Sequence, residues 1–91
     1  MREVREKAGF RRDVAKVVGS GRCRWDEIAV VIDLLRNDAP LPARYRDHAL
    51  KGEWIPAREC HVRGDLLLVY TKTPGELRLE RLASHSEIFG R

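Results

Sequence analysis

The sequence has few cysteines, few aromatic residues and no long apolar run. Its two cysteines, Cys23 and Cys60, stand outside any Cys-x-x-Cys or Cys/His ligand spacing, which excludes a dense disulfide framework and a zinc finger. We expect both to be reduced structural thiols, with a disulfide between them as the alternative. No stretch reaches the roughly 18 apolar residues of a membrane span, and the N-terminus has no signal-peptide pattern. We therefore expect a soluble, cytoplasmic protein with no membrane partner.

Charged residues, in contrast, are abundant. They make up 35% of the 91 residues, and 18 Lys and Arg against 14 Asp and Glu give a net charge of +4. A basic balance favours a polyanionic partner, although it indicates attraction and not chemistry. The length allows one modest core, so we expect residues 1–91 to form a single domain.

The first part of the chain predicts a short strand followed by a helix. Residues 1–6 alternate weakly, as in an edge strand. From Phe10 the apolar spacing becomes helical and continues to the glycines at 19–21, which end the helix. We expect its buried side to comprise Phe10, Val14, Val17 and Val18. We expect its water-facing side to comprise Arg11, Arg12, Asp13 and Lys16.

A second helix is predicted over residues 25–36. Asp26 and Glu27 suit its first turn, where free N–H groups favour negative charge. The sequence Asn-Asp-Ala-Pro at 37–40 ends it, because proline cannot continue the hydrogen-bond ladder. The two helices, joined by a short glycine turn, form an αα-hairpin. The predicted buried stripe of the second helix is Trp25, Ile28, Ile32 and Leu35.

The rest of the chain predicts an antiparallel sheet. Residues 55–62 form a strand that Pro56 restricts to an edge or a bulge. Residues 66–71 form an apolar run typical of a central strand covered on both faces, and after a turn at 73–76 residues 77–82 alternate as in a half-buried strand. We therefore predict an α+β fold: a short N-terminal strand, a two-helix hairpin, then an antiparallel β-meander with the helices packed on one face.

Polar residues that can carry chemistry flank the predicted strands. His48 follows Asp47, His61 ends one strand, Asp65 begins the next, and His85 lies just past the last. Histidines that converge with a carboxylate and arginines can transfer protons and stabilise a phosphorane-like transition state without metal. RNA provides its own 2′-OH as nucleophile. That combination describes a metal-independent endoribonuclease that leaves a 2′,3′-cyclic phosphate.

Each of these residues also has a structural interpretation. His48 is also consistent with a solvated side chain in a polar loop. His61 and His85 are also consistent with hydrogen-bonded histidines at strand ends. Asp65 fits a residue that stabilises its turn, and Phe89 fits a C-terminal hydrophobic anchor. The arginines fit a solvated basic face. Composition and spacing leave both interpretations open.

Three ordered segments resemble the signature of YafQ-type toxins in the RelE superfamily, which are ribosome-dependent mRNA interferases of type II toxin-antitoxin systems. These segments are LPARYRDHALKGEW, RECHVRGDLLLVY and SHSEIF. FRRDVAKV and the helix ending in IDLLRN resemble the two preceding helices of that family, so the resemblance spans nearly the whole chain and implies a RelE-like fold.

The resemblance also implies a site. It implies catalytic roles for His48, His61, Asp65 and His85, a phosphate-binding role for Arg81, and a base-positioning role for Phe89. We add Arg46 and Arg63 as candidate substrate contacts. It further implies mRNA in the ribosomal A site as substrate, the ribosome and a cognate acidic antitoxin as partners, and no metal or other cofactor.

The chain departs from the family pattern at three places. Leu66 replaces a tryptophan after the aspartate, so we expect Leu66→Trp to raise or retain activity. Gly64 replaces a proline, which loosens the turn, and Leu82-Ala83 replace residues that include a glycine. The departures at Leu66 and Leu82-Ala83 support an alternative function, a relative that binds RNA or an antitoxin without cleaving.

Overall fold

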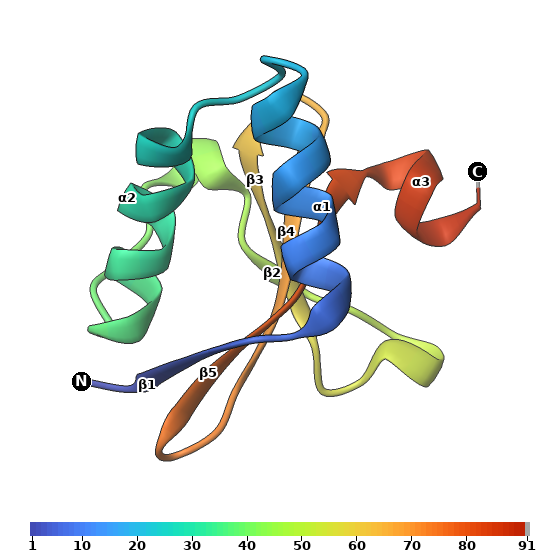
Figure 1. The fold of residues 1–91 in the computed structure, drawn as a ribbon. Helices are drawn as coiled ribbons and strands as arrows, with labels where there is room; N and C mark the ends of the chain where they lie inside the picture. The colour runs from blue at the N-terminus through green and yellow to red at the C-terminus, as the bar shows by residue number, and fades with distance from the viewer. Residues whose placement is uncertain (91) are drawn as a thin grey trace.

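The computed structural model describes residues 1–90, which form one mixed sheet with two long helices against it (Figure 1). Five strands lie in the order β1-β5-β4-β3-β2. β1 pairs in parallel with β5, and the other neighbouring strands are antiparallel. This arrangement confirms the predicted α+β fold. The elements are β1 (Glu3–Glu6), α1 (Ala8–Gly19), α2 (Trp25–Arg36), η1 (Ala43–Tyr45), β2 (His48–Ala49), η2 (Gly52–Trp54), β3 (Arg58–Arg63), β4 (Leu66–Lys72), β5 (Glu76–Ser84) and α3 (His85–Phe89).

The main core lies between the sheet and helices α1 and α2. The alternation of β4 sends Leu66, Leu68 and Tyr70 to this side, where they are at most 5% exposed. They pack against apolar residues of the two helices, including Phe10 and Ile28. The predicted packing of both helices on one sheet face is therefore confirmed.

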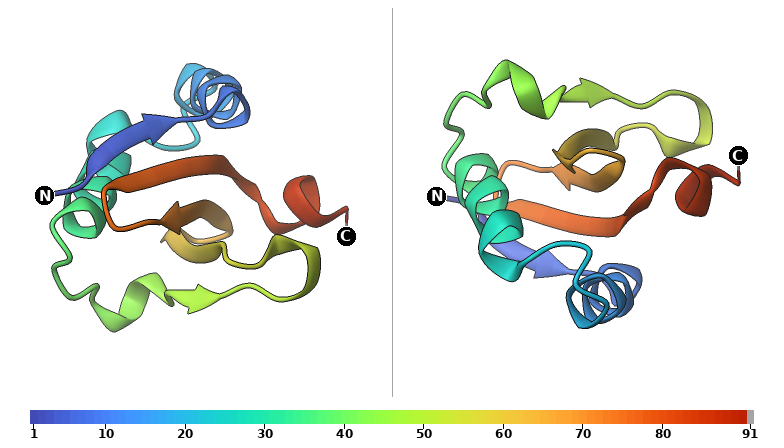
Figure 2. Two further views of the ribbon diagram at one scale, coloured as in Figure 1. Left: turned by 90° about the horizontal axis from the view of Figure 1, so that it is seen from below. Right: turned by 90° about the horizontal axis from the view of Figure 1, so that it is seen from above.

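A second, smaller cluster covers the other face of the sheet. Leu67 and Val69 of β4 point to this side and join Ala57, Ala83 and Ile88. Partly buried residues of the segment between β2 and β3, and of α3, pack against this cluster. β4 is thus covered on both faces, as its continuous apolar sequence predicted. The end-on views in Figure 2 show α1 and α2 on one side of the strands and α3 at the far end of β5.

Three expectations about helix faces were wrong. Asp13 is buried, with only 8% of its surface exposed, because it accepts hydrogen bonds from Arg81 and the backbone of β5. Trp25 is 44% exposed, since it is the first residue of α2, and Val31 supplies buried surface that the prediction omitted. Val18 is 38% exposed, in the last turn of α1.

The C-terminal half contains three elements that the sequence did not predict, β2, η2 and α3. β2 is a two-residue strand that pairs with Arg58 and Glu59, so β3 is not at the edge there. β3 begins at Arg58, so Pro56 precedes the strand and does not interrupt it. The strand has an irregularity between His61 and Arg63, which is away from the proline. Residues 85–89, expected to be a tail, form helix α3.

Both cysteines are buried and free, as predicted. Burial raises the pKa of the Cys60 thiol to about 12, so it is an unreactive core residue. Within residues 1–90, no helix has the length and apolar character needed to cross a membrane.

Candidate active site

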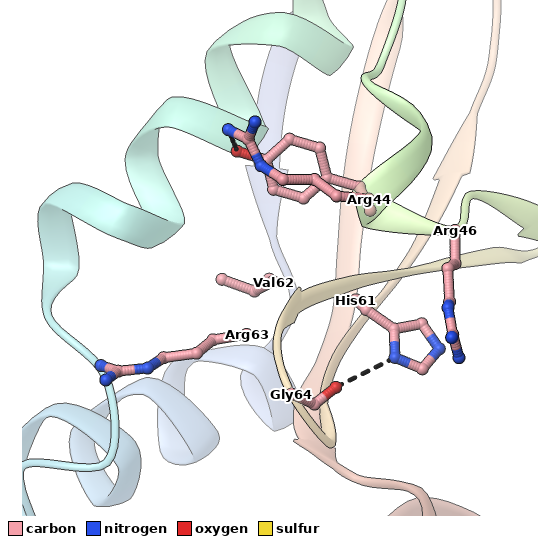
Figure 3. Close-up of a pocket in the computed structure, with 7 residues that line it drawn as sticks. Arg44, Arg46, His61, Val62, Arg63 and Gly64 are labelled. Carbon is pink, nitrogen blue, oxygen red and sulfur yellow. Dashed lines mark hydrogen bonds between the residues drawn. The ribbon is translucent and has the colours of Figure 1, made fainter.

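His61 lies on β3 with one ring nitrogen held by the adjoining turn. Its Nδ1 is 3.0 Å from the carbonyl oxygen of Gly64 (Figure 3). A carbonyl oxygen only accepts, so Nδ1 carries the proton and Nε2 of the neutral ring has a lone pair available. The turn that provides this carbonyl needs a left-handed residue, and Gly64 has a φ of 53°. The Arg63–Asp65 turn therefore fixes the tautomer of His61.

His48 lies in β2 and contacts a carboxylate that the sequence analysis did not select. Its Nδ1 is 2.8 Å from the carbonyl oxygen of Arg46, and its Nε2 is 2.7 Å from Oε1 of Glu59. Both ring nitrogens thus face acceptors, which is the hydrogen-bonding pattern of a doubly protonated ring. His48 and Glu59 therefore form a hydrogen-bonded pair across the β2–β3 ladder, which is an ion pair when His48 is protonated.

Glu59 is the most buried acidic group of this region. The residue is 4% exposed, and its second oxygen, Oε2, is buried without a hydrogen-bond partner within residues 1–90. An unpaired buried carboxylate oxygen is unfavourable by itself. Because Oε2 is also shielded from solvent, the Glu59 side chain must turn before this oxygen can accept a proton or a hydrogen bond from a bound molecule. One signal in the sequence pointed to it: Glu59 is two residues before His61, and alternate residues of a strand share a face.

His85 and Phe89 meet Glu59 at one pocket. The His85 and Phe89 rings lie 4.7 Å apart, and the Trp54 ring contacts Phe89 edge-on at 5.2 Å. These side chains face an open pocket of about 590 Å³, which we call the Glu59 pocket. Its lining residues are Leu50, Lys51, Glu53, Trp54, Glu59, His85 and Phe89.

α3 is held in place by a reciprocal cap. Ser84 Oγ accepts from the backbone N–H of Glu87, and Glu87 Oε1 accepts from the backbone N–H of Ser84. These bonds to Ser84 lower the pKa of Glu87 to about 2, with a further contribution from Arg22. The cap fixes where the helix starts, and therefore where His85 stands beside Phe89.

A second, basic pocket lies on the other side of His61. It has a volume of about 400 Å³ and is formed between η1 and the end of β3. Figure 3 shows the Arg46 side chain extending alongside the His61 ring, while Arg63 extends toward α2. We call it the arginine pocket; its lining residues are Arg44, Tyr45, Arg46, His61, Val62, Arg63 and Gly64.

The segment that carries Arg46 and His48 is clamped to the sheet through Asp47. Tyr70 of β4 donates a short hydrogen bond to Oδ1 of Asp47, and Arg58 of β3 donates to Oδ2 at 3.0 Å. Burial and the bond to Asp47 raise the pKa of the Tyr70 hydroxyl, so it stays a donor at neutral pH. Asp47 and His48 are adjacent in an extended segment, so the clamp on one side of β2 directs His48 to the side of Glu59.

The structure does not bring every predicted site residue together. Asp65 is exposed, and its side chain makes no hydrogen bond or ion pair with any residue in the described part of the chain. Arg81 is held by Asp13 through two bonds, of 2.7 and 3.3 Å, so its charge is partly neutralised. Arg63 pairs with Glu27 at 3.4 Å. The catalytic role of Asp65 and the substrate roles of Arg81 and Arg63 stay predictions.

The described residues contain no group of three or more His, Cys, Asp or Glu side chains placed to hold a metal ion. What the geometry provides is a set of proton donors and acceptors beside arginines, on one end of a small α+β sheet. This is the chemistry of a site for proton transfer on a polyanionic substrate.

The comparisons with known proteins agree with this class. Residues 2–90 match the family described as a bacterial toxin of type II toxin-antitoxin systems, YafQ. The chain therefore belongs to the YafQ family of toxins, as its three motifs predicted.

Two curated relatives are mRNA interferase toxins YafQ from Escherichia coli. The K12 protein is 46% identical over 57 residues, which cover 63% of this chain and 62% of that protein. The BL21-DE3 protein is 34% identical over 90 residues, covering 98% of this chain and 97% of that protein. A crystal structure of the E. coli DinJ-YafQ complex contains a chain that is 34% identical, with a TM-score of 0.86 and coverage of 99% and 100%. The prediction of an mRNA-cleaving enzyme agrees with these relatives.

Proposed function

We propose that this toxin is an endoribonuclease that cleaves mRNA on the ribosome by attack of a 2′-OH on the adjacent phosphate. One observation carries the proposal: Glu59, held by His48, faces the same pocket as His85 and leaves one buried oxygen without an internal partner. A structural ion pair would normally satisfy both carboxylate oxygens. The enzyme activity is the one for which the E. coli relatives are named.

In the proposed reaction, a bond forms between the 2′-oxygen and phosphorus while the bond from phosphorus to the 5′-oxygen breaks. The Glu59 side chain turns its buried Oε2 toward the pocket, where this oxygen accepts the 2′-OH proton, and His85 donates a proton to the departing 5′-oxygen. The products are a 2′,3′-cyclic phosphate and a 5′-OH. His48 donates to Oε1 of Glu59 and positions its carboxylate.

The remaining residues bind and orient the RNA. The ring of His61 and the guanidinium of Arg46 lie beside each other and supply polar contacts for the phosphate (Figure 3). Phe89, packed between Trp54 and His85, offers an aromatic face on which a base can stack. Asp65 and Arg81 take no part in the proton transfers of this scheme. No step in this scheme needs a metal.

The partners follow from the same assignment. We propose that the substrate is mRNA in the ribosomal A site, in the cytoplasm, and that the toxin is neutralised by an antitoxin with an acidic segment. The net charge of +4 and the arginine pocket favour such a segment. A YafQ relative was crystallised with the antitoxin DinJ.

The test compares His61→Ala and His85→Ala with the unmodified toxin. Both side chains point into open pockets, so we expect the melting temperature to change by only a few degrees. We expect cleavage of a translated message to fall by roughly 10²–10⁴-fold for His85→Ala, the usual effect of losing one general acid or base. We expect it to fall for His61→Ala as well, because that variant loses a contact to the reacting phosphate. Induced expression should arrest growth for the unmodified toxin alone.

The alternative is a relative that binds RNA or an antitoxin without cleaving. It gains support if the unmodified toxin leaves growth and translated messages intact. Activity that falls only as far as the folded fraction does would place both histidines in the scaffold and contradict the proposed site.

A further inference from the structure

The arginine pocket has no role in the proton transfers assigned above, although it adjoins the proposed site at His61. We propose that it is a subsite for a second RNA phosphate, the one next to the phosphate that is cleaved. This inference rests on the proposed function and extends it to a neighbouring nucleotide.

The first support is the position of the pocket on β3. Glu59 and His61 lie on the same face of this strand, two residues apart, which corresponds to about 6.6 Å along an extended chain. The Glu59 pocket is therefore on one side of His61 and the arginine pocket on the other. A strand of RNA that places its reacting phosphate at His61 would continue into the arginine pocket.

The second support is the state of the arginines that line it. Arg44 and Arg46 form no ion pair with any carboxylate in residues 1–90, so their charges are not neutralised. Arg44 is also ordered: its guanidinium lies 4.7 Å from the centre of the Tyr45 ring and donates to the Tyr45 hydroxyl at 3.0 Å. An ordered guanidinium loses little conformational entropy when it binds an anion.

The third support is the backbone of β3. β2 pairs only with Arg58 and Glu59, so the strand edge from Cys60 to Arg63 has no strand partner on that side within the described residues. An unpaired strand edge presents N–H groups to its surroundings. Phosphate oxygens are acceptors for such groups as well as for arginine. The exposed 3.4 Å ion pair between Arg63 and Glu27 can exchange for a phosphate at little cost.

The test measures the salt dependence of RNA binding by the full chain. The probe is a 2′-O-methyl RNA trinucleotide, which has two phosphodiesters and cannot be cleaved, titrated between 50 and 200 mM salt. Each phosphate contact contributes about 0.7 to the slope of log K against log salt for a single strand. We expect the Arg44→Gln/Arg63→Gln variant to bind several-fold more weakly and to lose about 0.7 of this slope.

A matched control separates a subsite from general attraction. Arg5 and Arg78 lie in another basic cluster with Lys7, around Glu76, on β1 and β5. Arg5→Gln/Arg78→Gln removes the same charge, and we expect it to keep the slope of the unmodified protein. An equal loss of slope in the two variants would overturn the proposal.

Chemical changes in the probe provide a second test that needs no variant. We expect an uncharged methylphosphonate at the flanking linkage to lower the slope of the unmodified toxin by about 0.7. We also expect the phosphodiester probe to shift the amide resonances of Val62 and Gly64. Absence of both effects would contradict the subsite even if a variant failed to fold.

These outcomes distinguish the two proposals. If translated messages are cleaved but the slope matches the control, the subsite is wrong and the proposed function stands. If the slope changes as expected but messages are not cleaved, the pocket binds phosphate and the proposed function fails.

Discussion

At the scale of single residues, Glu59 is the group whose environment departs most from that of a structural carboxylate. Its Oε1 contacts His48 and its Oε2 is buried without a partner. We predict that Glu59→Gln lowers cleavage by roughly 10²–10⁴-fold, because the amide cannot accept the 2′-OH proton. The fold should be retained, since glutamine has nearly the same shape and its side-chain oxygen can still accept from His48.

The measurement combines single-turnover cleavage of a translated message with thermal unfolding. Glu53→Gln serves as a control, because Glu53 lines the same pocket but is exposed. A Glu59→Gln protein that cleaves as fast as the control would contradict the assignment of the base.

The structure changes the effect that we predict for tryptophan at position 66. The family pattern suggested a position beside the site, where tryptophan would retain activity. Leu66 is 5% exposed and belongs to the core cluster under the helices, on the face of β4 opposite to the Glu59 pocket. We now predict that Leu66→Trp lowers the free energy of unfolding by about 1–3 kcal/mol through overpacking.

Urea denaturation measures this loss, with Leu66→Met as a volume-conserving control that should cost less than about 1.5 kcal/mol. Equal stability of the two variants, together with higher activity of Leu66→Trp, would restore the earlier expectation.

At the scale of elements, α3 depends on the ionised form of Glu87. The folded pKa of Glu87 is about 2, below its ordinary value of 4.5. Because the folded pKa is lowered, the stabilisation is present above pH 4.5 and is lost as the pH falls toward 2. We predict that the Ser84 amide resonance titrates in this window and that α3 loosens there.

The check is a pH titration followed by nuclear magnetic resonance. Glu87→Gln should abolish the transition at Ser84, whereas Glu3→Gln, on the exposed β1 strand, should leave it unchanged. At neutral pH, Glu87→Gln should also lower cleavage several-fold, because His85 and Phe89 are carried on this helix. A Ser84 amide that does not respond between pH 4.5 and 2 would show that the cap does not depend on this charge.

The elements that the sequence predicted well are those set by local pattern. The limits of α2, residues 25–36, and the turn between β4 and β5 follow from periodicity and from local turn residues. β2 escaped prediction because two residues have no period, and it exists only through its pairing with β3. α3 escaped because it is a single five-residue segment fixed by its cap and by packing on the sheet.

The site was predicted only in part, for the same physical reason. The motifs identified the histidines, but Glu59 became a candidate only when β2 placed His48 against it. Likewise, helical spacing places Asp13 on the water-facing side of α1. Only the fold shows that Asp13 accepts hydrogen bonds from Arg81 and from the backbone N–H of Leu82. Whether a charged residue is paired or unpaired depends on distant partners, which periodicity does not report.

At the scale of the whole molecule, the helices and the proposed active site lie on different parts of the sheet. The helices bury one face of the sheet. The Glu59 pocket lies on the other face of the sheet. The arginine pocket lies next to it, at the edge of β3. Such a division leaves the chemistry to a few side chains and to the RNA itself. Cleavage by the proposed mechanism therefore requires a ribose at the cleaved position and an intact ribosomal complex to present it.

The most direct measurement uses a message with a single 2′-deoxynucleotide at the mapped cleavage position, placed in the ribosomal A site. We predict that the toxin cuts the all-ribose message, leaving a 2′,3′-cyclic phosphate and a 5′-OH, and that it leaves the substituted message intact. Cleavage of the 2′-deoxy message at the same position would contradict attack by the 2′-OH, and with it the mechanism proposed for this site.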